Sequence, residues 1–291
     1  MDKVVKFALA GGDMRQARLA AMLARDGHRV YVSYMEKAGE IEGVESVGLE
    51  EALAQADCVL LPLPALNGEG LLNTPLSDEK IAPAELLRLV PVHTPVFGGR
   101  LSRAFLEAAE ELGLHTEDYF EREELKIANA AATAEGAVQI AMEETASMLC
   151  GARALVIGYG RIGKLLSAKL KALGAAVTVS ARKPADLAWI KANGCEAVDT
   201  AALEPLLAKQ ELIFNTVPAL VMDRRRLSLL KGDCVCIDLA SRPGGLDFEA
   251  AAALGVKVIW ALSLPGEVAP VSSGAAIRDT VYNLLAERGT L

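Results

Sequence analysis

The sequence has few aromatic residues, and this scarcity restricts the kind of core that it can form. Aromatic side chains make up 4% of the 291 residues, whereas 52% of the residues are hydrophobic. Ala, Leu and Val dominate, which favours aliphatic strands covered by Ala-rich helices over a β-sandwich with an aromatic core. The length suits two domains of ordinary size better than one.

Histidine is also rare, and the cysteines are not paired in the sequence. The five cysteines are scattered without a C-x-x-C motif, and the three histidines lie far apart. These spacings predict neither a zinc site nor a disulfide framework, so no metal is expected. Cys234 and Cys236 alternate on an apparent strand, where they are expected to be small buried side chains. A reducing cytoplasm suits this cysteine usage.

The chain lacks an excess of positive charge and lacks long apolar runs. It has 30 Lys and Arg against 38 Asp and Glu, a net charge of −8, which argues against a nucleic-acid-binding surface. No stretch reaches the ~20 apolar residues of a membrane span. The apolar run in "MDKVVKFALAGG" is too short for a signal peptide. We therefore expect a soluble, cytoplasmic protein with no nucleic-acid or membrane partner.

The first part of the chain alternates strand-like and helix-like segments. Short apolar runs that end at Gly or Pro are separated by segments with helical periodicity, which predicts a parallel sheet covered by helices on both faces. The strand-like runs are "VVKFALAGG", "HRVYVSY", "CVLLPLP" and "PVHTPVFGG". Residues 1–130 are therefore predicted to form an N-terminal, doubly wound α/β domain on the substrate side.

A helix-favouring segment and a second α/β series follow. "EREELKIANAAATAEGAVQIAMEETASMLC" favours helix almost throughout, with one interruption at 133–136, and we expect an interdomain helix at 131–150. Residues 151–271 repeat the strand–turn–helix order, which predicts a second doubly wound parallel-sheet domain. Residues 272–291 are predicted to form an amphipathic C-terminal helix that could pack back on the first domain.

The second series opens with a glycine-rich loop. "ALVIGYGRIGKLL" contains G-x-G-x-x-G after an aliphatic strand and before a helix, which is the context of a dinucleotide-binding loop. The first glycine permits a tight turn, the second lets the backbone approach the pyrophosphate, and the third allows close packing of helix on strand. The loop residues expected to bind the cofactor are Gly158, Tyr159, Gly160, Arg161, Ile162 and Gly163.

The next strand ends in "VTVSARKP", where an acidic residue would bind the ribose 2′-hydroxyl of NAD. Ala181 occupies this position, 18 residues after Gly163. Arg182 and Lys183 supply positive charge suited to a 2′-phosphate, and Ser180 could add a hydroxyl donor. This tip predicts NADP(H) as the cofactor; the alternative is a basic surface pair with no ligand.

Later strand ends in this domain are expected to face the same cofactor. "FNTVPALV" and "IDLASRPGGLDF" follow strands that should flank the dinucleotide. Ser241 and Arg242 could reach into an interdomain cleft. The residues expected along the nicotinamide side are Asn215, Thr216, Val217 and Pro218.

Candidate substrate residues follow the first strand of the N-terminal domain. "GGDMRQ" places Asp13, Arg15 and Gln16 at a carboxyl strand end, where open α/β sheets bind ligands, and an Arg there suits a carboxylate. The alternative is a helix N-cap at Asp13 beside a solvated Arg15. Asn67, His93 and Arg100 are expected at the same edge, with His93 either an acid–base group or structural.

Taken in order, these motifs resemble the family of the dipicolinate synthase A subunit, together with "NAAATAEGAVQIAMEET" and "LPGEVAPVSSG". More distantly, "GYGRIG" and "LPGEVAPVSS" resemble the D-2-hydroxyacid and alanine dehydrogenases. The closer resemblance implies NADP-dependent oxidation of dihydrodipicolinate, a small dicarboxylate, to dipicolinate. It also implies that the partner is the flavoprotein-like B subunit of the synthase, and that the location is the mother-cell cytoplasm of a sporulating bacterium.

Under this resemblance, Arg15 with Gln16 would bind one substrate carboxylate, and Arg242 or Ser241 the other. Asp13, His93 and Glu135 compete for the role of base. Homo-oligomerisation stays open. Two alternatives also stay open: an NADPH-dependent reductase of 2-oxo or imino acids, and a non-catalytic NADP-binding regulatory subunit. The reductase is disfavoured because no histidine follows "FNTVP".

Overall fold

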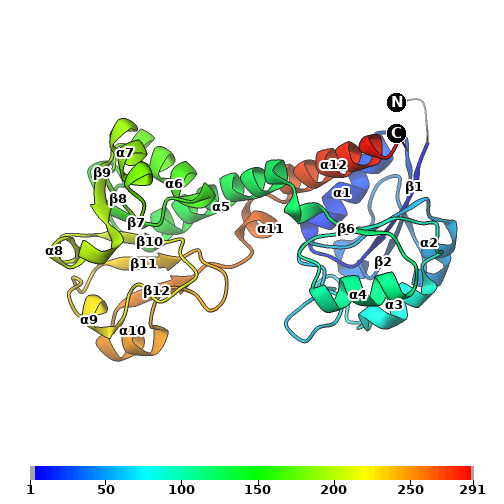
Figure 1. Ribbon diagram of the computed structural model, residues 1–291, viewed down its shortest axis with the longest axis horizontal. Helices are drawn as coiled ribbons and strands as arrows, with labels where there is room; N and C mark the ends of the chain where they lie inside the picture. The colour runs from blue at the N-terminus through cyan, green and yellow to red at the C-terminus, as the bar shows by residue number, and fades with distance from the viewer. Residues whose placement is uncertain (1–3, 290–291) are drawn as a thin grey trace. The chain divides into compact units, whose positions relative to one another are not determined.

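The computed structural model describes residues 4–289, and it divides into two compact units, each built on a six-stranded parallel sheet (Figure 1). Unit 1 comprises Met1–Asn129 with Ala269–Leu291, and unit 2 comprises Ala130–Val268. Residues 1–3 of the expected first domain and residues 290–291 of the expected C-terminal helix lie outside the described part. The predicted fold class, two doubly wound α/β domains, is confirmed.

The sheet of unit 1 has the strand order β3-β2-β1-β4-β5-β6. Its strands are β1 Lys6–Ala10, β2 Arg29–Ser33, β3 Glu45–Ser46, β4 Cys58–Leu60, β5 Val96–Gly98 and β6 Thr116–Asp118. Its helices are α1 Met14–Arg25, α2 Leu49–Gln55, α3 Pro83–Leu89, α4 Arg103–Glu111 and α12 Pro270–Glu287. The strands β3 and β6 were not predicted, because they are short edge strands without an apolar run.

Alternating side chains of β1 enter two different cores, one on each face of the sheet. Phe7 and Leu9 pack with residues of α1 and α12, whereas Ala8 and Ala10 pack with residues of α2 and α3. Successive side chains of a strand point to opposite faces, so helices cover both faces of this sheet. Helix α12 lies beside α1 (Figure 1), and its Ile277 belongs to the same core as Phe7.

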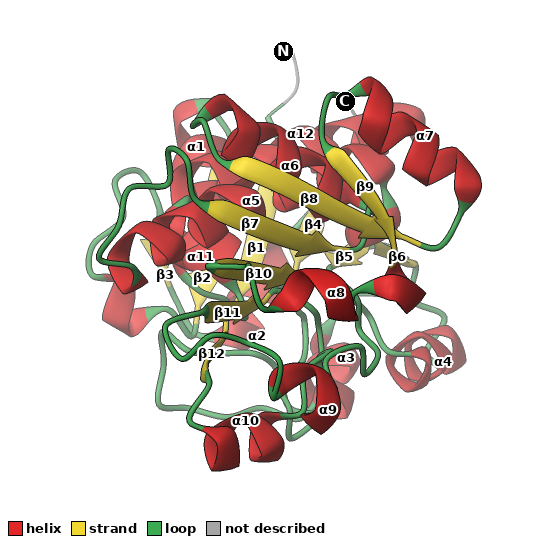
Figure 2. Ribbon diagram, turned by 90° about the vertical axis from the view of Figure 1, so that its left-hand side faces the viewer, coloured by secondary structure: helices red, strands yellow, loops and turns green. Residues whose placement is uncertain are grey.

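The sheet of unit 2 has the strand order β12-β11-β10-β7-β8-β9. Its strands are β7 Arg153–Ile157, β8 Ala176–Ala181, β9 Glu196–Asp199, β10 Leu212–Asn215, β11 Val235–Asp238 and β12 Lys257–Trp260. Its helices are α6 Arg161–Ala172, α7 Pro184–Ala192, α8 Glu204–Leu207, α9 Arg224–Leu227, α10 Phe248–Leu254 and α11 Leu264–Val268. The arrows of β7, β8 and β9 point the same way in Figure 2, so their carboxyl ends share one edge.

The long helix α5 spans Glu123–Glu144 and contains the boundary between the units. It begins before the expected range of 131–150 and ends at Glu144, where the Thr145 hydroxyl donates to the Ala141 carbonyl. The expected interruption at 133–136 is wrong. Gly136 is helical because α11 packs closely on it: a Cβ there would lie 3.2 Å from atoms of Leu264 and Val268.

Membrane-spanning helices and metal-binding clusters are both absent from residues 4–289. No helix in this part of the chain is long and apolar enough to cross a membrane. The same residues contain no group of three or more His, Cys, Asp or Glu side chains that could hold a metal ion. Cys236 lies in β11 and Cys234 two residues before it, and both are buried as predicted.

His28 is a buried titratable residue in unit 1. Its Nδ1 accepts a hydrogen bond from the Val5 N–H at 3.3 Å, and its ring lies between the rings of Phe7 and Tyr282. Among the described residues, its Nε2 has no hydrogen-bond partner. Burial lowers the pKa of His28 below its usual value of 6.5, although Asp26 acts in the opposite direction.

The lowered pKa makes the stability of unit 1 depend on pH. As pH falls below about 6.5, the unfolded chain binds a proton at His28 before the folded chain does, so stability is lost, by at most about 1.4 kcal/mol per pH unit. The acid limb is the fall in the free energy of unfolding below about pH 6.5. We expect it to be shallower in His28→Gln, measured from urea unfolding curves at about pH 7.5, 6.5, 5.5 and 5. The exposed His115, replaced by Gln, is the control and should leave the limb unchanged. Equal slopes for wild type and His28→Gln would contradict the expectation.

Candidate dinucleotide-binding site

The glycine loop connects β7 to α6 and leaves the start of that helix open. Gly158 has φ +99°, and Gly160 is the N-cap of α6, which no side chain caps. A Cβ at Gly163 would lie 2.1 Å from the Gly158 carbonyl oxygen, so α6 can approach β7 only because this residue has no side chain. A Cβ at Gly160 would meet nothing within 4 Å. The loop therefore fits a dinucleotide, because free N–H groups at a helix start bind phosphate.

The segment after β10 packs against this loop. The Thr216 hydroxyl donates to the Ile157 carbonyl at 2.9 Å, and a Cβ on Gly158 would lie 2.4 Å from the same hydroxyl. Val217 also borders Gly158, and Pro218 is exposed beyond it. Thr216, Val217 and Pro218 thus follow β10 beside the glycine loop, as predicted for a segment along the cofactor.

Two other loop residues are held by neighbouring side chains. Tyr159 is half-buried, and its hydroxyl accepts a hydrogen bond from Asn193 Nδ2 at 2.9 Å. Ile162 packs partly against the core of unit 2, while Arg161 is exposed in the first turn of α6.

The tip of β8 presents cations after a strand that is buried from Val177 to Ala181. Arg182 and Lys183 are exposed, and within residues 4–289 neither side chain makes a hydrogen bond or an ion pair. Ala181 is buried, with Asp199 of β9 as its register partner. The role expected for Ser180 is wrong: its side chain is buried and accepts a hydrogen bond from the Thr200 hydroxyl at 3.2 Å.

Asp238, at the end of β11, is a site residue that the sequence reasoning missed. This fully buried carboxylate accepts hydrogen bonds from Asn215 Nδ2 at 2.8 Å, the Ala240 N–H at 3.0 Å and the Gly245 N–H at 2.7 Å. Asn215 is equally buried and also donates to the Val217 carbonyl, so direct contact of Asn215 with a cofactor is wrong. A carboxylate ending the apolar run "VCID" was the available signal.

Ser241 and Arg242 follow β11 and are exposed. The Arg242 guanidinium lies 5.5 Å from the centre of the Trp260 ring, and Trp260 Nε1 donates to the Ala240 carbonyl at 2.9 Å. Both candidate substrate residues of unit 2 are therefore accessible at the carboxyl edge of its sheet, with Arg242 beside an aromatic face.

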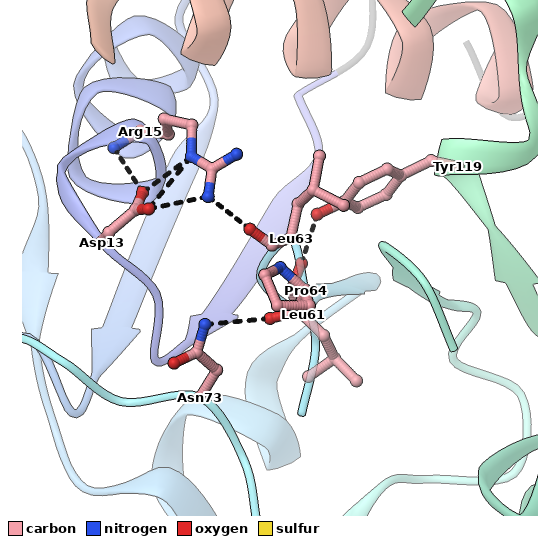
Figure 3. A network of polar contacts seen from close by, with 7 residues as sticks. All are labelled: Asp13, Arg15, Leu61, Leu63, Pro64, Asn73 and Tyr119. Carbon is pink, nitrogen blue, oxygen red and sulfur yellow. Dashed lines mark hydrogen bonds and ion pairs between the residues drawn. The ribbon is translucent and has the colours of Figure 1, made fainter. Parts of the chain in front are cut away.

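In unit 1, the predicted substrate residue Arg15 and the candidate base Asp13 belong to a structural network (Figure 3). Asp13 is the N-cap of α1 and accepts from the Arg15 N–H at 2.9 Å. The Arg15 side chain, 7% exposed, pairs with Asp13 at 2.7 Å and donates to the Leu63 carbonyl. Tyr119 donates to the Leu61 carbonyl at 2.8 Å, and Asn73 donates to the Pro64 carbonyl at 3.2 Å. The network fixes residues 61–64 at the carboxyl edge of the sheet.

Burial changes the roles expected for Arg15 and Gln16. The cavity beside Arg15 has a volume of about 10 Å³, which is room for a single water and not for a dicarboxylate. The solvated Arg15 of the alternative reading is also wrong, because the side chain is buried. Gln16 is buried too, and its amide donates to the Leu60 carbonyl at 3.1 Å.

The other candidates of unit 1 lie in different places. Asn67 Oδ1 accepts from the N–H groups of Glu69 and Leu71 and closes a turn. Arg100 is exposed after β5, with its N–H bound to the Asp118 carboxylate at 3.0 Å. His93 precedes β5 and is exposed, so its expected place at the carboxyl edge is wrong: it lies at the amino edge.

Glu135, the third candidate base, is an exposed residue of α5 in unit 2. Its carboxylate pairs with Lys169 of α6 at 2.8 Å. Lys169 is eight residues after Arg161, the first residue of α6, which is about 12 Å along the helix axis. Glu135 is therefore held away from the glycine loop. Of the three candidates, only Asp13 lies at a carboxyl edge, and both of its oxygens accept from Arg15.

Known protein families match both units. Residues 6–120 match the N-terminal domain of the dipicolinate synthase A subunit. Residues 123–258 match the NAD binding domain of D-isomer specific 2-hydroxyacid dehydrogenases, so unit 2 carries a nicotinamide dinucleotide site. The dipicolinate synthase A subunit of Bacillus subtilis (strain 168) is 33% identical over 287 residues, which covers 97% of this chain and 96% of that protein.

Two solved structures agree with this match over nearly the whole chain. The crystal structure of the dipicolinate synthase A chain from Bacillus subtilis has a TM-score of 0.86 at 31% identity, covering 99% of this chain and 97% of that chain. The crystal structure of the corresponding dipicolinate synthase chain from Bacillus halodurans has the same TM-score and identity, covering 97% and 99%.

Two glycine substitutions separate folding from dinucleotide binding. Gly160→Ala adds a methyl group in open space, so we expect an unchanged Tm but at least about tenfold weaker binding of NADPH, because the methyl group hinders approach of the pyrophosphate. Gly163→Ala forces a methyl group against the Gly158 carbonyl and should cost about 1–3 kcal/mol of stability. Thermal unfolding and NADPH titration measure both. Wild-type affinity in Gly160→Ala would rule out this loop as the pyrophosphate site.

Proposed function

Because this chain belongs to the family of the dipicolinate synthase A subunit, we propose that it oxidises dihydrodipicolinate to dipicolinate with NADP⁺, together with the flavoprotein-like B subunit. Family membership and the dehydrogenase-type NAD-binding domain make the chain an oxidoreductase. The proposal adds the substrate, the preference for NADP and the partner. The observation that carries it is the end-to-end match at 33% identity, joined to a glycine loop that fits a dinucleotide.

The proposed reaction removes two electrons and two protons from the dihydropyridine ring. A ring carbon loses a hydride, the ring loses one proton, and pyridine-2,6-dicarboxylate remains. When bound, NADP⁺ supplies the hydride acceptor. Aromatisation makes the oxidation favourable. The main task of the protein is therefore to orient the ring so that its C–H bond faces the hydride acceptor.

The residues proposed to hold the dinucleotide all lie at the carboxyl edge of unit 2. The open N-terminus of α6 would bind the pyrophosphate, and the Thr216–Pro218 segment would border the cofactor beside Gly158. Arg182 and Lys183 would bind the 2′-phosphate, since both are exposed and have no partner within residues 4–289. This arrangement supports NADP over NAD.

The residues proposed to hold the substrate are accessible polar side chains at the carboxyl edge of unit 2. Arg242, with Ser241, would bind a substrate carboxylate at the carboxyl edge of unit 2. Arg15 becomes a positioning residue, because Asp13 and the Leu63 carbonyl occupy its guanidinium. We propose that the ring proton passes to water, because His93, Glu135 and Asp13 are misplaced or paired.

A coupled assay tests the function. The purified chain, with and without the B subunit, is mixed with NADP⁺ and freshly generated dihydrodipicolinate precursor, and the NADPH and dipicolinate absorbance bands are followed together. We expect one NADPH per dipicolinate when both chains are present. Consumption of NADPH with 2-oxo or imino acids instead would favour the reductase. Binding of NADP(H) without any turnover attributable to this chain would favour the regulatory subunit.

The basic strand tip gives a prediction about cofactor preference. We expect the double variant Arg182→Ala/Lys183→Ala to bind NADPH about 10- to 100-fold more weakly, while NADH affinity changes little, because only NADPH carries the 2′-phosphate. Fluorescence titration with both cofactors measures this. Lys209→Ala/Lys231→Ala is the matched control: it removes the same charge from exposed residues that precede β10 and β11 at the opposite edge. Equal losses for NADH and NADPH would refute the assignment.

A further inference from the structure

The loop after β11 carries the residues proposed to bind a substrate carboxylate, and one buried side chain holds both of its ends. Asp238, the last residue of β11, accepts a hydrogen bond from the Ala240 N–H at 3.0 Å and another from the Gly245 N–H at 2.7 Å. Between these two points the chain is exposed only at residues 241–243. We call residues 240–245 the β11 loop.

The pair formed by Asp238 and Asn215 joins this loop to the segment after β10. The two residues are register partners at the ends of neighbouring strands, and both are fully buried. Asn215 Nδ2 donates to Asp238 at 2.8 Å and to the Val217 carbonyl at 2.9 Å, and Asn215 Oδ1 accepts from the Val217 N–H at 3.1 Å. Each member of the pair therefore holds the backbone of one loop by two hydrogen bonds.

A second set of contacts joins the two loops farther along the chain. The Gly245 carbonyl accepts hydrogen bonds from the N–H groups of Val221 at 2.9 Å and Met222 at 3.0 Å. A Cβ at Gly245 would collide with Asn215 Nδ2 and lie 2.5 Å from the Val217 carbonyl oxygen, so only glycine fits there. The β11 loop and the segment after β10 therefore form one packed unit at the carboxyl edge of the sheet.

The Arg242 guanidinium is open to a ligand and lies beside an aromatic ring of β12. Within residues 4–289 it makes no hydrogen bond or ion pair, and it lies 5.5 Å from the centre of the Trp260 ring. Trp260 Nε1 donates to the Ala240 carbonyl at 2.9 Å, and the Trp260 ring stacks on Phe248 with 4.8 Å between ring centres. Both backbone groups of Ala240 are therefore bonded, directly before the exposed part of the loop.

The chemistry of the buried pair indicates positioning more than stability. Burying a carboxylate is costly even when N–H groups surround it, and apolar residues of similar volume often stabilise a core as well or better. The three preceding register pairs of β10 and β11 are apolar, so the polar pair occurs only where the two loops begin. A fully bonded polar network fixes one backbone arrangement, because its hydrogen bonds are directional.

We propose that Asp238 and Asn215 are positioning residues for the proposed reaction: they hold the β11 loop against the segment that borders the cofactor, so that Arg242 meets a substrate carboxylate in one fixed place. This inference rests on the proposed function, which supplies the substrate and the role of Arg242. Asp238 acts only through the loop, because it is buried and already accepts three hydrogen bonds.

Binding of dipicolinate to the NADPH-saturated chain, with the B subunit present, tests the proposal by calorimetry. In Asp238→Asn, an NH₂ group replaces one acceptor oxygen and meets an N–H group, so at least one hydrogen bond to the pair is lost. We expect affinity for dipicolinate to fall at least about tenfold. The affinity of the chain alone for NADPH should stay within about twofold of wild type, because the pyrophosphate binds at the start of α6.

A double-mutant cycle with Arg242→Ala separates positioning from stability. If Asp238 acts through Arg242, Asp238→Asn should weaken dipicolinate binding little further in an Arg242→Ala background, whereas independent effects would multiply. Two controls should bind dipicolinate like wild type. Ile237→Val lowers the Tm by removing a buried methyl group next to Asp238, and Asp223→Asn removes an exposed carboxylate while keeping the N-cap of α9.

A second variant covers the case in which Asp238→Asn does not fold. Asn215→Ala leaves Asp238 with its two backbone donors, and we expect the same loss of dipicolinate affinity. Wild-type affinity in either folded variant, or independent effects in the cycle, would overturn the proposal. If wild type does not bind dipicolinate, or if Arg242→Ala binds it normally, the proposed substrate site is wrong and the inference falls with it.

Discussion

The close approach of α6 to β7 is the constraint on which the site of unit 2 depends. Gly163 lies so near the Gly158 carbonyl that no side chain fits between them, which fixes where α6 begins. That start leaves the N–H groups at Gly160 uncapped, seats Thr216 against Gly158 and turns Tyr159 toward Asn193. The shape of the glycine loop therefore depends on one close backbone contact.

A second constraint acts through the buried carboxylate of Asp238. A buried charge is tolerated where N–H groups surround it, and Asp238 accepts three hydrogen bonds, from Asn215, Ala240 and Gly245. These donors come from Asn215, the last residue of β10, and from the segment that follows β11. The carboxylate thus links the segment that carries Thr216–Pro218 to the segment that carries Ser241 and Arg242.

Local patterns were enough to predict the fold and the dinucleotide loop. The alternation of apolar strands with helices is repeated along the chain, and the G-x-G-x-x-G motif lies in the strand–turn–helix context that gives it meaning. The edge strands β3, β6 and β9 escaped prediction, because a short, half-exposed strand has no apolar run. The bounds of α5 were misjudged because Gly136 suggests a break, whereas in the structure it allows close packing.

The roles of individual polar residues were harder to predict, because strand ends place side chains both inward and outward. Arg15, Gln16, Ser180 and Asn215 were all candidates for ligand contact, yet each is buried and hydrogen-bonded within its own unit. A sequence shows that such a residue follows a strand. It does not show whether the side chain forms a hydrogen bond with a carbonyl or side chain of a distant segment. Asp13 and Leu63, 50 residues apart, decide the place of Arg15.

The charge at the end of β8 depends on which residues are buried and which are exposed. Strand β8 is buried through Ala181, so only the residues after it can meet a ligand. Arg182 and Lys183 are those residues, and the neighbouring acid, Asp199, accepts a hydrogen bond from the Ala201 N–H and caps the turn that follows β9. A 2′-hydroxyl needs an acceptor aimed at the ribose, whereas a 2′-phosphate needs cations that contact its oxygens directly. Two unpaired cations beside one capping carboxylate give the tip a net positive charge, which suits the phosphate and provides no acceptor from β8 for the hydroxyl.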